Sequence, residues 1–497
     1  MKFILLLLKY FNQNKSQSAL LFGIGLFLFF LLVNPLSLPS HSSIVLSVAV
    51  LMVSWWVLGA LPLPVVALMP LVLFPLFDIS SVKEVTKSYS DSVVFLFMGG
   101  FFLGIAIEKW NLHRRIALGI INITGTNGNH IILGFIIATC FLSLWLSNTA
   151  TTMMMYPIAL SVIQVVGSSN ENNKSMKHFS LVLMLSLAYA SNFALGTIIG
   201  TPPNVAYVNY ISEKYGYSIG FTDWMLVFMP LTIVLTFFLY WVLVKWLYPN
   251  QIVHSEEARA YIRSELKKLG KMSVPEKRVA GIFLVTVLCW IFKDVINANQ
   301  SLFELEDASI AMFGALLLFV VPSGKKETNS AVIPLLTWDD TAKMAWGILI
   351  LFGGGIALAK SLEDAQLMSL FGNELATMAT GNVLLMICIV TAASVFLSEV
   401  MSNVAQVIVM APVVSSMAAS LHMDPLLLGI PMTLGASCAS MLPMGTPPNA
   451  IVFASGHIKM KNMLFAGFVL NIVSIILIVL FCYFLQPVII KTIFHFH

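Results

Sequence analysis

Gly200-Thr-Pro-Pro-Asn204 lies in an apolar stretch of the sequence, and the same five residues return at Gly445-Thr-Pro-Pro-Asn449. A Ser-Asn pair precedes each pentapeptide, Ser147-Asn148 in the first case and Ser402-Asn403 in the second. The spacing between pair and pentapeptide is longer in the first case because a polar insert occupies 167–174. The sequence therefore predicts a chain made of two related halves.

The composition places much of this chain in a lipid bilayer. Of its 497 residues, 58% are hydrophobic and only 10% are charged, whereas about 25% of the residues of a soluble domain are charged. The net charge of +4 is spread over short loops, so no nucleic-acid partner is expected. The five cysteines have no metal-binding spacing and are expected to be small buried hydrophobes.

Apolar segments of roughly 20 residues, or fewer where tilted, predict membrane-crossing helices. They are 19–34, 43–61, 63–77, 93–107, 223–248, 279–294, 306–322, 346–360 and 463–486. Four further apolar regions are interrupted by polar residues, Gly and Pro, which lipid-exposed helices do not tolerate. We expect re-entrant hairpins at 130–165 and 382–420, and broken helices at 179–211 and 425–456. The predicted fold is an all-α polytopic membrane protein with about 11 transmembrane helices.

The Lys and Arg residues predict the orientation of the chain. The basic linker 249–278, the N-terminal tail and 323–326 are expected on the cytoplasmic side, because short cytoplasmic loops are rich in Lys and Arg. The segment 108–115 carries Arg114 and Arg115, whereas its counterpart after 346–360 carries acids and no Arg. The halves therefore point in opposite directions, as inverted repeats of transporters do.

This reasoning gives an expected domain organisation. Residues 1–42 form a cytoplasmic N-terminus and an extra first helix, 43–248 the first repeat, 249–278 a cytoplasmic linker and 279–497 the second repeat. The N-terminus is expected in the cytoplasm and the C-terminus outside.

The Ser-Asn pairs have the chemistry of an ion site. Ser143 and Ser147 are four residues apart and share a helix face. A turn at Asn148 would leave carbonyl oxygens for a monovalent cation, and the next helix would offer its N–H groups to a carboxylate. Asn148 and Thr149 would lie at this tip.

The second half repeats the pattern with Ser398, Ser402 and Asn403, but Val404 stands where the first half has Thr149. Tandem prolines unwind a helix, so Gly200 and Gly445 would expose carbonyl oxygens. Thr201 and Thr446 would offer hydroxyl groups to a substrate.

Charge is nearly absent from these motifs. Glu399 is the only acidic residue in the cores of the motifs, and an ionisable group at membrane depth is a functional candidate. The alternative is that Glu399 reaches water or pairs with a neighbouring residue. Neither motif contains Arg or Lys. An anion would therefore need bound cations and helix dipoles, and cation and anion would each favour the other's binding.

The motifs resemble those of the divalent anion/sodium symporters. The resemblance rests on Ser147-Asn148-Thr149, on Ser402-Asn403 and on Ala436-Ser-Cys-Ala-Ser-Met-Leu-Pro-Met-Gly-Thr-Pro-Pro-Asn-Ala-Ile-Val-Phe453, and it extends from about residue 43 to the end. It implies a homodimer with an elevator mechanism. Scaffold and transport domains would each be assembled from both repeats.

The resemblance also implies two sodium sites and one dicarboxylate site, with no organic cofactor. The first sodium would bind Ser143, Ser147, Asn148 and Gly200. The second would bind Ser398, Met401 through its carbonyl, Ser402, Asn403 and Gly445. The substrate would contact Ser147, Asn148, Thr149, Thr201, Pro202, Ser402, Asn403, Val404, Thr446 and Pro447.

The expected function is therefore sodium-coupled transport of C4-dicarboxylates (succinate, malate, fumarate) across the cytoplasmic membrane. Because Val404 removes one hydroxyl, sulfate and citrate remain open as substrates, as does dicarboxylate exchange. A proton-coupled antiporter that uses Glu399 is a further alternative. A channel or an intramembrane enzyme is disfavoured, because the polar residues gather at two tips and the spans lack a His-Glu-x-x-His or a paired-Asp motif.

Overall fold

The computed structural model describes residues 15–485, apart from 126, 169–172, 218, 251, 253–255, 301, 327–331, 369 and 371–381. Lys2 and Lys9 of the N-terminal tail and the chain end after 485 lie outside these residues. The described chain forms two compact units, each assembled from separate parts of the sequence. We describe each unit by itself.

The first unit contains the chain up to Val94, Ala206–Gly216 and Ala345–Ala436. Its helices are α2 (Lys15–Val33), α3 (Ser40–Leu58), α4 (Leu63–Ala67), α5 (Met69–Leu76), α6 (Val82–Tyr89), most of α12 (Pro202–Tyr215), α18 (Trp346–Asp364), α20 (Val383–Leu397), α21 (Asn403–Ser420) and α22 (Pro425–Ala436).

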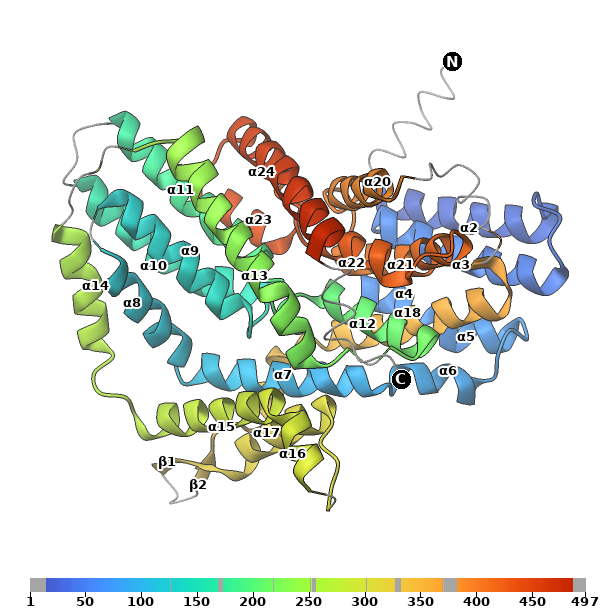
Figure 1. Ribbon diagram of the computed structural model, residues 1–497, viewed down its shortest axis with the longest axis horizontal. Helices are drawn as coiled ribbons and strands as arrows, with labels where there is room; N and C mark the ends of the chain where they lie inside the picture. The colour runs from blue at the N-terminus through green and yellow to red at the C-terminus, as the bar shows by residue number, and fades with distance from the viewer. Residues whose placement is uncertain are drawn as a thin grey trace. The chain divides into compact units, whose positions relative to one another are not determined.

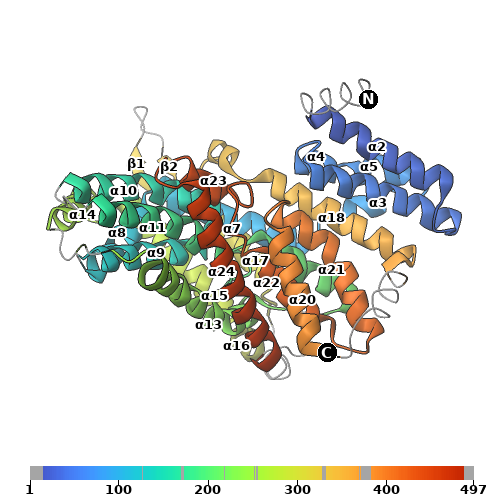
Figure 2. The ribbon, with the colours of Figure 1, turned by 90° about the horizontal axis from the view of Figure 1, so that it is seen from above.

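Glycines bring α18 close to its neighbours in the first unit. A Cβ on Gly354 would overlap the backbone of Ala67 in α4, and one on Gly353 would overlap Tyr89 in α6. The Tyr89 hydroxyl donates a hydrogen bond to the Ala67 carbonyl oxygen. On its other sides α18 lies beside α3 and α21 (Figure 2). The Gly353-Gly354 pair is therefore a helix-packing feature.

The predicted span 63–77 is divided in the structure. α4 ends at Ala67 and α5 begins at Met69, and the segment contains Pro64, Pro70 and Pro75. Proline removes a backbone donor and clashes with the preceding turn. An uninterrupted helix is therefore replaced by two short ones.

The second unit contains Phe95–Val205, Tyr217–Met344 and the chain from Ser437. Its helices are α7 (Ser92–Lys109, apart from its first residues), α8 (Leu112–Thr124), α9 (Gly128–Ser143), α10 (Asn148–Ser168), α11 (Asn173–Asn192), α13 (Phe221–Tyr240) with the π-helix η1 (Trp241–Leu247), α14 (Glu256–Lys268), α15 (Val274–Ile291), α16 (Lys293–Asn299), α17 (Asp307–Val320), the 3-10 helix η2 (Trp338–Lys343), α23 (Pro447–Phe453) and α24 (Met460–Leu480) with the π-helix η3 (Phe481–Leu485).

Helices α9, α10 and α11 lie side by side in the second unit, with α8 next to α9 (Figure 1). From Phe179 to its end, α11 is buried, including Tyr189. A helix segment that is buried on every side lies inside a bundle. This bundle carries the first Ser-Asn motif at the junction of α9 and α10.

Ion pairs join α8 to the basic linker in the same unit. Arg114 pairs with Glu265 of α14, and Arg115 Nε lies 3.0 Å from Glu276 Oε1 of α15. The hydrogen bond from Lys268, together with Arg114, lowers the pKa of Glu265. The segments 108–115 and 249–278 therefore lie at the same end of the unit, as their shared basic character predicts.

The predicted fold class is confirmed, because the chain is an all-α polytopic membrane protein. Every predicted span contains helix, and seven described helices are long and apolar enough to cross a membrane by length and composition. One feature was not predicted: β1 (Pro322–Lys326) pairs antiparallel with β2 (Val332–Pro334). This short ribbon follows α17, and just after β2 the Leu336 N–H donates to the Leu318 carbonyl oxygen of α17 at 2.9 Å.

Candidate functional site

The first Ser-Asn motif forms a tip between two helices. α9 ends at Ser143 and α10 begins at Asn148, and the residues between them are not helical. Ser147 Oγ accepts a hydrogen bond from the Ala150 N–H at 3.2 Å. This is the bond of an N-cap, so Ser147 fixes where α10 begins.

Three oxygens surround the amide of Asn148 at this tip. One end of the amide lies 2.8 Å from Ser143 Oγ, 3.0 Å from the Gly200 carbonyl oxygen and 3.1 Å from the Ser191 carbonyl oxygen. The two carbonyl oxygens can only accept, which assigns the amide nitrogen Nδ2 to this end. We call these three oxygens the oxygen cage. Such a cage suits an N–H donor or a small cation.

The cage depends on an unwound segment between α11 and α12, residues 193–201. Thr197 Oγ1 donates to the Leu144 carbonyl oxygen at 2.6 Å, which ties the segment to the tip. Asn204 Nδ2 donates to the Thr197 carbonyl oxygen at 3.0 Å. A Cβ on Gly200 would overlap the Ala194 carbonyl oxygen, so only glycine fits here without a backbone shift.

The second Gly-Thr-Pro-Pro-Asn motif is held in the same way. Residues 437–446 are not helical, and Asn449 Nδ2 donates to the Leu442 carbonyl oxygen at 3.1 Å. In both motifs the asparagine thus reaches the carbonyl of the seventh residue before it. The Thr446 side chain caps α23 by accepting from Asn449 N–H at 3.4 Å. The sequence repeat is therefore also a repeat of hydrogen bonds.

Two residues that were not singled out from the sequence tie the two halves together within this unit. Asn192 Nδ2 of the first half donates to Thr446 Oγ1 of the second at 3.1 Å. Ser437 Oγ of the second half donates to Thr201 Oγ1 of the first at 3.3 Å. We call these two bonds the cross-brace. Asn192 and Ser437 precede the threonines of their own halves by the same interval, a spacing that could have identified them.

The second Ser-Asn motif forms a tip in the first unit. α20 ends at Leu397, and α21 begins at Asn403. Ser398 Oγ lies 2.7 Å from Asn403 Oδ1 and also contacts the Ala436 carbonyl oxygen. Gln406, which was not predicted as a site residue, donates to Ser394 Oγ at 2.6 Å. This tip therefore has its own internal support.

Of the predicted site residues, the structure places Ser143, Asn148 and Gly200 in mutual contact at the first tip and Ser398 beside Asn403 at the second. The predicted site residues in the second unit are Ser143, Ser147, Asn148, Thr149, Gly200, Thr201, Pro202, Gly445, Thr446 and Pro447, and those in the first unit are Ser398, Met401, Ser402, Asn403 and Val404. Thr201 and Thr446 are buried, and Pro447 is exposed. The predicted sets of the second sodium and of the substrate thus include residues from both units.

Charge is scarce around these motifs. The segments 143–152, 192–204 and 437–449 contain no Asp, Glu, Lys or Arg. Glu399 at the second tip is only 4% exposed, so it is not a solvated loop residue. An anion at the first tip could be held by N–H groups, hydroxyl groups and bound cations.

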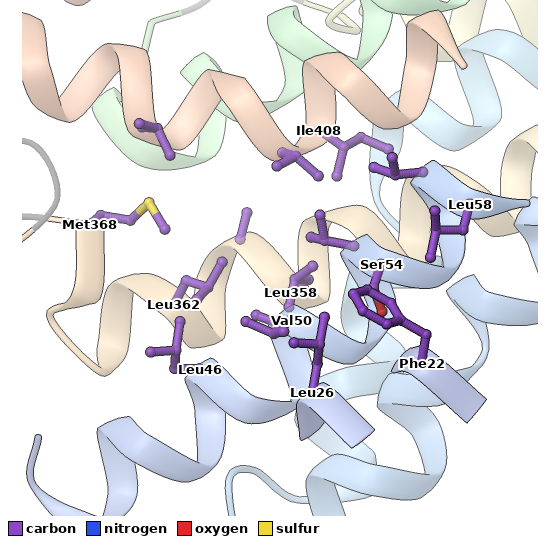
Figure 3. A pocket seen from close by; sticks show the side chains of 16 residues that line it. Phe22, Leu26, Leu46, Val50, Ser54, Leu58, Leu358, Leu362, Met368 and Ile408 are labelled. Carbon is purple, nitrogen blue, oxygen red and sulfur yellow. The ribbon is translucent and has the colours of Figure 1, made fainter. Parts of the chain in front are cut away.

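An apolar cavity of about 390 Å³ in the first unit is a poor alternative site for an anion. It lies among α2, α3, α18 and α21, with Leu46, Leu358 and Ile408 among its lining residues (Figure 3). The one polar side chain that lines it, Ser54, donates to the Leu51 carbonyl oxygen at 2.8 Å. A carboxylate there would lose its hydration without gaining a partner.

Comparison with known families identifies the group to which these motifs belong. The model of the sodium:sulfate symporter transmembrane region matches residues 13–490. The chain belongs to this family. Sodium:sulfate symporter family members move solutes across membranes, so the protein is a membrane transporter and the expected family resemblance is confirmed.

Named relatives support this assignment over nearly the full length of this sodium:sulfate symporter family member. The sodium-dependent dicarboxylate transporter SdcS of Staphylococcus saprophyticus is 37% identical over 488 residues, which cover 96% of this chain and 93% of the relative. SdcS of Staphylococcus aureus strain USA300 is 36% identical over 502 residues, with 97% and 95% covered.

A solved structure resembles this family member in fold alone. The YdaH transporter of Alcanivorax borkumensis, whose crystal structure revealed an unusual topology, aligns with a TM-score of 0.54 and 13% sequence identity. The alignment covers 82% of this chain and 87% of that one. This similarity agrees with a polytopic helical transporter fold.

Proposed function

We propose that this protein carries C4-dicarboxylates such as succinate, malate and fumarate across the cytoplasmic membrane, driven by sodium ions. Membership of the sodium:sulfate symporter family supports sodium as the coupling ion. The relatives at 36–37% identity are named sodium-dependent dicarboxylate transporters, which supports the substrate class.

The oxygen cage around Asn148 is the observation on which the proposal depends. Sodium is a hard cation that prefers oxygen ligands, and carbonyls of unwound helices supply them in transporters. Ser143 Oγ and the Gly200 carbonyl oxygen already converge on one point. The residues present therefore fit a sodium ion, with Ser143, Ser147, Asn148 and Gly200 as the proposed first site.

Rotation of one amide would couple the cation to the substrate. In the described arrangement Asn148 Nδ2 faces the cage. A sodium ion in the cage repels this N–H group and attracts Oδ1, so the amide turns over. Nδ2 then points away from the cage and can donate to a substrate carboxylate. The free energy of each binding event would thus favour the other.

The proposed carboxylate position lies beside the first turn of α10. Its N–H groups carry the positive end of the helix dipole, and Ser147, Asn148 and Thr149 add polar side chains. The hydroxyl groups of Thr201 and Thr446 would donate hydrogen bonds to the substrate. Pro202 and Pro447 would form apolar walls of the site. No cationic side chain occurs in these segments, so the cation is needed to balance the charge.

We propose that the second tip binds a second sodium ion through Ser398, Met401, Ser402 and Asn403. The short distance between Ser398 Oγ and Asn403 Oδ1, 2.7 Å, repeats the geometry of the first tip. The participation of Gly445 in this site, and of Ser402, Asn403 and Val404 in substrate binding, stays a prediction from the family resemblance.

Further proposals rest on the sequence. They are a homodimer, an elevator mechanism with scaffold and transport domains, the four-part domain organisation, a cytoplasmic N-terminus and an external C-terminus. The contacts of Arg114 and Arg115 with α14 and α15 support a common cytoplasmic side for 108–115 and 249–278.

Uptake of radiolabelled succinate into proteoliposomes tests the proposal. An inward sodium gradient should raise the initial rate at least about tenfold over an equal potassium gradient. Liposomes preloaded with unlabelled succinate test exchange in the same preparation. Failure of sodium-driven uptake together with active exchange would replace symport by exchange, and failure of both would refute the dicarboxylate assignment.

Sulfate is a second candidate substrate, because the matching family model is named for sodium:sulfate symport. Competition separates the candidates: unlabelled malate and fumarate should inhibit succinate uptake, whereas sulfate and citrate should inhibit weakly. Strong inhibition by sulfate, with sodium-driven uptake of labelled sulfate, would make sulfate the substrate in place of the C4-dicarboxylates.

The burial of Glu399 keeps proton coupling open as an alternative. Replacing Glu399 by Gln removes the titrating group with little change of shape. Retention of sodium-driven uptake would exclude proton-driven antiport by this residue, and loss of a proton-driven component would favour it.

A further inference from the structure

A basic cavity of about 550 Å³ lies in the second unit, apart from both motifs. The beginning of α11, the residue after η1 and the approach to α24 line it. Its basic lining residues are Lys174, Lys177, His178, His457 and Lys459. No acidic side chain is among the described residues that line it. The cavity is therefore suited to an anion.

Among the described residues, the lysines of this cavity have no ion-pair partner, whereas two other lining side chains are hydrogen-bonded to the backbone. The ion pairs within the described part of the chain do not include Lys174, Lys177 or Lys459. His178 Nδ1 donates to the Pro249 carbonyl oxygen at 2.9 Å, and the Tyr248 hydroxyl donates to the Asn462 carbonyl oxygen at 3.4 Å. A wall held by hydrogen bonds, with ammonium groups that have no described acidic partner, suits an anionic ligand.

The cavity lies where hydrophobic segments end. The apolar segment Phe221–Leu247 ends one residue before Tyr248, and Met460–Phe484 begins one residue after Lys459. A tyrosine such as Tyr248 at this level is typical of the lipid–water boundary. Met176 and Leu181 add apolar lining next to the lysines. A ligand of this cavity would therefore meet charge and apolar surface together.

We propose that this cavity binds the phosphate group of an anionic phospholipid. The ammonium groups would pair with the phosphate, and Met176 and Leu181 would contact the start of the acyl chains. Basic pockets between membrane helices on the cytoplasmic side are suited to anionic headgroups. The N–H groups at the beginnings of α11 and α24 add to the positive field.

Native mass spectrometry of the purified full-length protein tests this site, with phosphatidylglycerol, phosphatidylcholine and inorganic phosphate as probes. The triple variant Lys174→Gln, Lys177→Gln, Lys459→Gln should bind its tightest phosphatidylglycerol about 100-fold more weakly, because each lysine near an anionic lipid contributes roughly a fivefold factor. Binding of phosphatidylcholine should not change. The double variant Lys174→Gln, Lys177→Gln should lose about 25-fold and serves if the triple variant does not fold.

A matched control removes three charges from the basic linker instead. Arg263, Lys267 and Lys271 are exposed and do not line the cavity, so their replacement by Gln should leave the tightest phosphatidylglycerol in place. Equal loss in both triple variants, or no loss in the cavity variant, would overturn the proposal. Full displacement of the lipid by millimolar inorganic phosphate would overturn it in favour of a soluble anion. These readouts do not depend on dicarboxylate transport.

Discussion

The two tips share a frame and differ in what supports it. A serine side chain lies 2.8 Å from Asn148 at the first tip and 2.7 Å from Asn403 at the second. The first tip depends on the unwound segment, through Thr197 and Gly200. The second is braced within its own hairpin by Gln406. The two tips therefore share the contact between serine and asparagine and differ in the residues that support it.

The residues at equivalent positions explain this difference. Gln406 reaches Ser394, whereas the equivalent Thr151 is too short to reach the equivalent Thr139, and the hydroxyl oxygens of both threonines are buried without a partner among the described residues. Glu399 stands where the first tip has Leu144, whose carbonyl oxygen accepts from Thr197. The first tip is therefore uncharged and is held by the unwound segment. The second carries a buried acid and is braced by Gln406 in addition to the contact of Ser398 with the Ala436 carbonyl oxygen.

The largest effect is expected where the tips agree. Replacing Asn148 or Asn403 by Ala should lower the rate of sodium-driven succinate uptake at least about 100-fold. Each amide loses a contact to a charged group, worth about 1.5–3 kcal/mol, on both the cation and the carboxylate side. Uptake in proteoliposomes with equal protein content, together with the melting temperature, measures this. Normal transport by either variant would refute the assignment of its tip.

Asparagines at the far ends of the same hairpins provide matched controls. Asn127 accepts from the His130 N–H at 2.8 Å and Asn382 from the Leu385 N–H at 3.2 Å, and each caps the first helix of its hairpin. Their replacement by Ala should cost about 1 kcal/mol of stability and leave sodium-driven uptake within about twofold. Loss of transport in these controls would mean that uptake reports hairpin stability.

The dependence of the first tip on the unwound segment predicts the next effect. A methyl group at Gly200 would overlap the Ala194 carbonyl oxygen, so Gly200→Ala should move a cage oxygen and raise the sodium concentration for half-maximal uptake about tenfold or more. Gly119→Ala, where the new methyl group has open space, is the control. An unchanged sodium dependence in Gly200→Ala would remove this carbonyl from the proposed site.

The cross-brace should affect the substrate more than the ion. Asn192 is buried, at 1% exposed, and Asn192→Ala would release Thr446 Oγ1 from its 3.1 Å bond. We expect the KM for succinate to rise about tenfold, with a smaller change in maximal rate, from the loss of one buried hydrogen bond of about 1 kcal/mol and the resulting freedom of Thr446. Ser437→Ala should act likewise through Thr201, and Ser437→Thr, which keeps a hydroxyl, should restore most of the affinity. An equal fall in rate for all substrates with an unchanged KM would indicate a purely structural role.

Much of the first tip could be predicted from the sequence because its residues form local patterns. Ser143, Asn148 and Gly200 follow from fixed spacings and from breaks in apolar segments. Asn192 and Ser437 share a spacing to the threonines of their own halves, but their partners lie in the other half of the chain, so the sequence does not show what they bind. Gln406 has no counterpart in the first half, where Thr151 stands, and no repeated pattern marks it. The ribbon β1–β2 was missed for another reason: two short strands leave little periodicity in a sequence dominated by apolar helices. Breaks in apolar helices can thus be recognised in the sequence, whereas the hydrogen bonds that hold the broken segments in place cannot.

The smallest effect is expected where the tips differ in one side chain. Val404→Thr has nearly the same shape and adds one hydroxyl group, while Thr149→Val removes one. Val404 is 9% exposed, so an added hydroxyl without a partner would cost stability, and the gain from a new bond to a carboxylate would be partly offset. We expect about a threefold lower KM for succinate in Val404→Thr and a three- to tenfold higher KM in Thr149→Val.

The double exchange Thr149→Val with Val404→Thr decides whether the two positions are equivalent. If each hydroxyl meets the same kind of carboxylate, the exchanged protein should recover part of the affinity that Thr149→Val loses. If only a hydroxyl group beside the oxygen cage at position 149 can reach the carboxylate, the double variant should have the same KM as Thr149→Val alone. KM values for succinate, malate and sulfate, measured with all variants at saturating sodium, separate these outcomes. A shift of preference from dicarboxylates toward sulfate in Thr149→Val would make this single hydroxyl the determinant of substrate class.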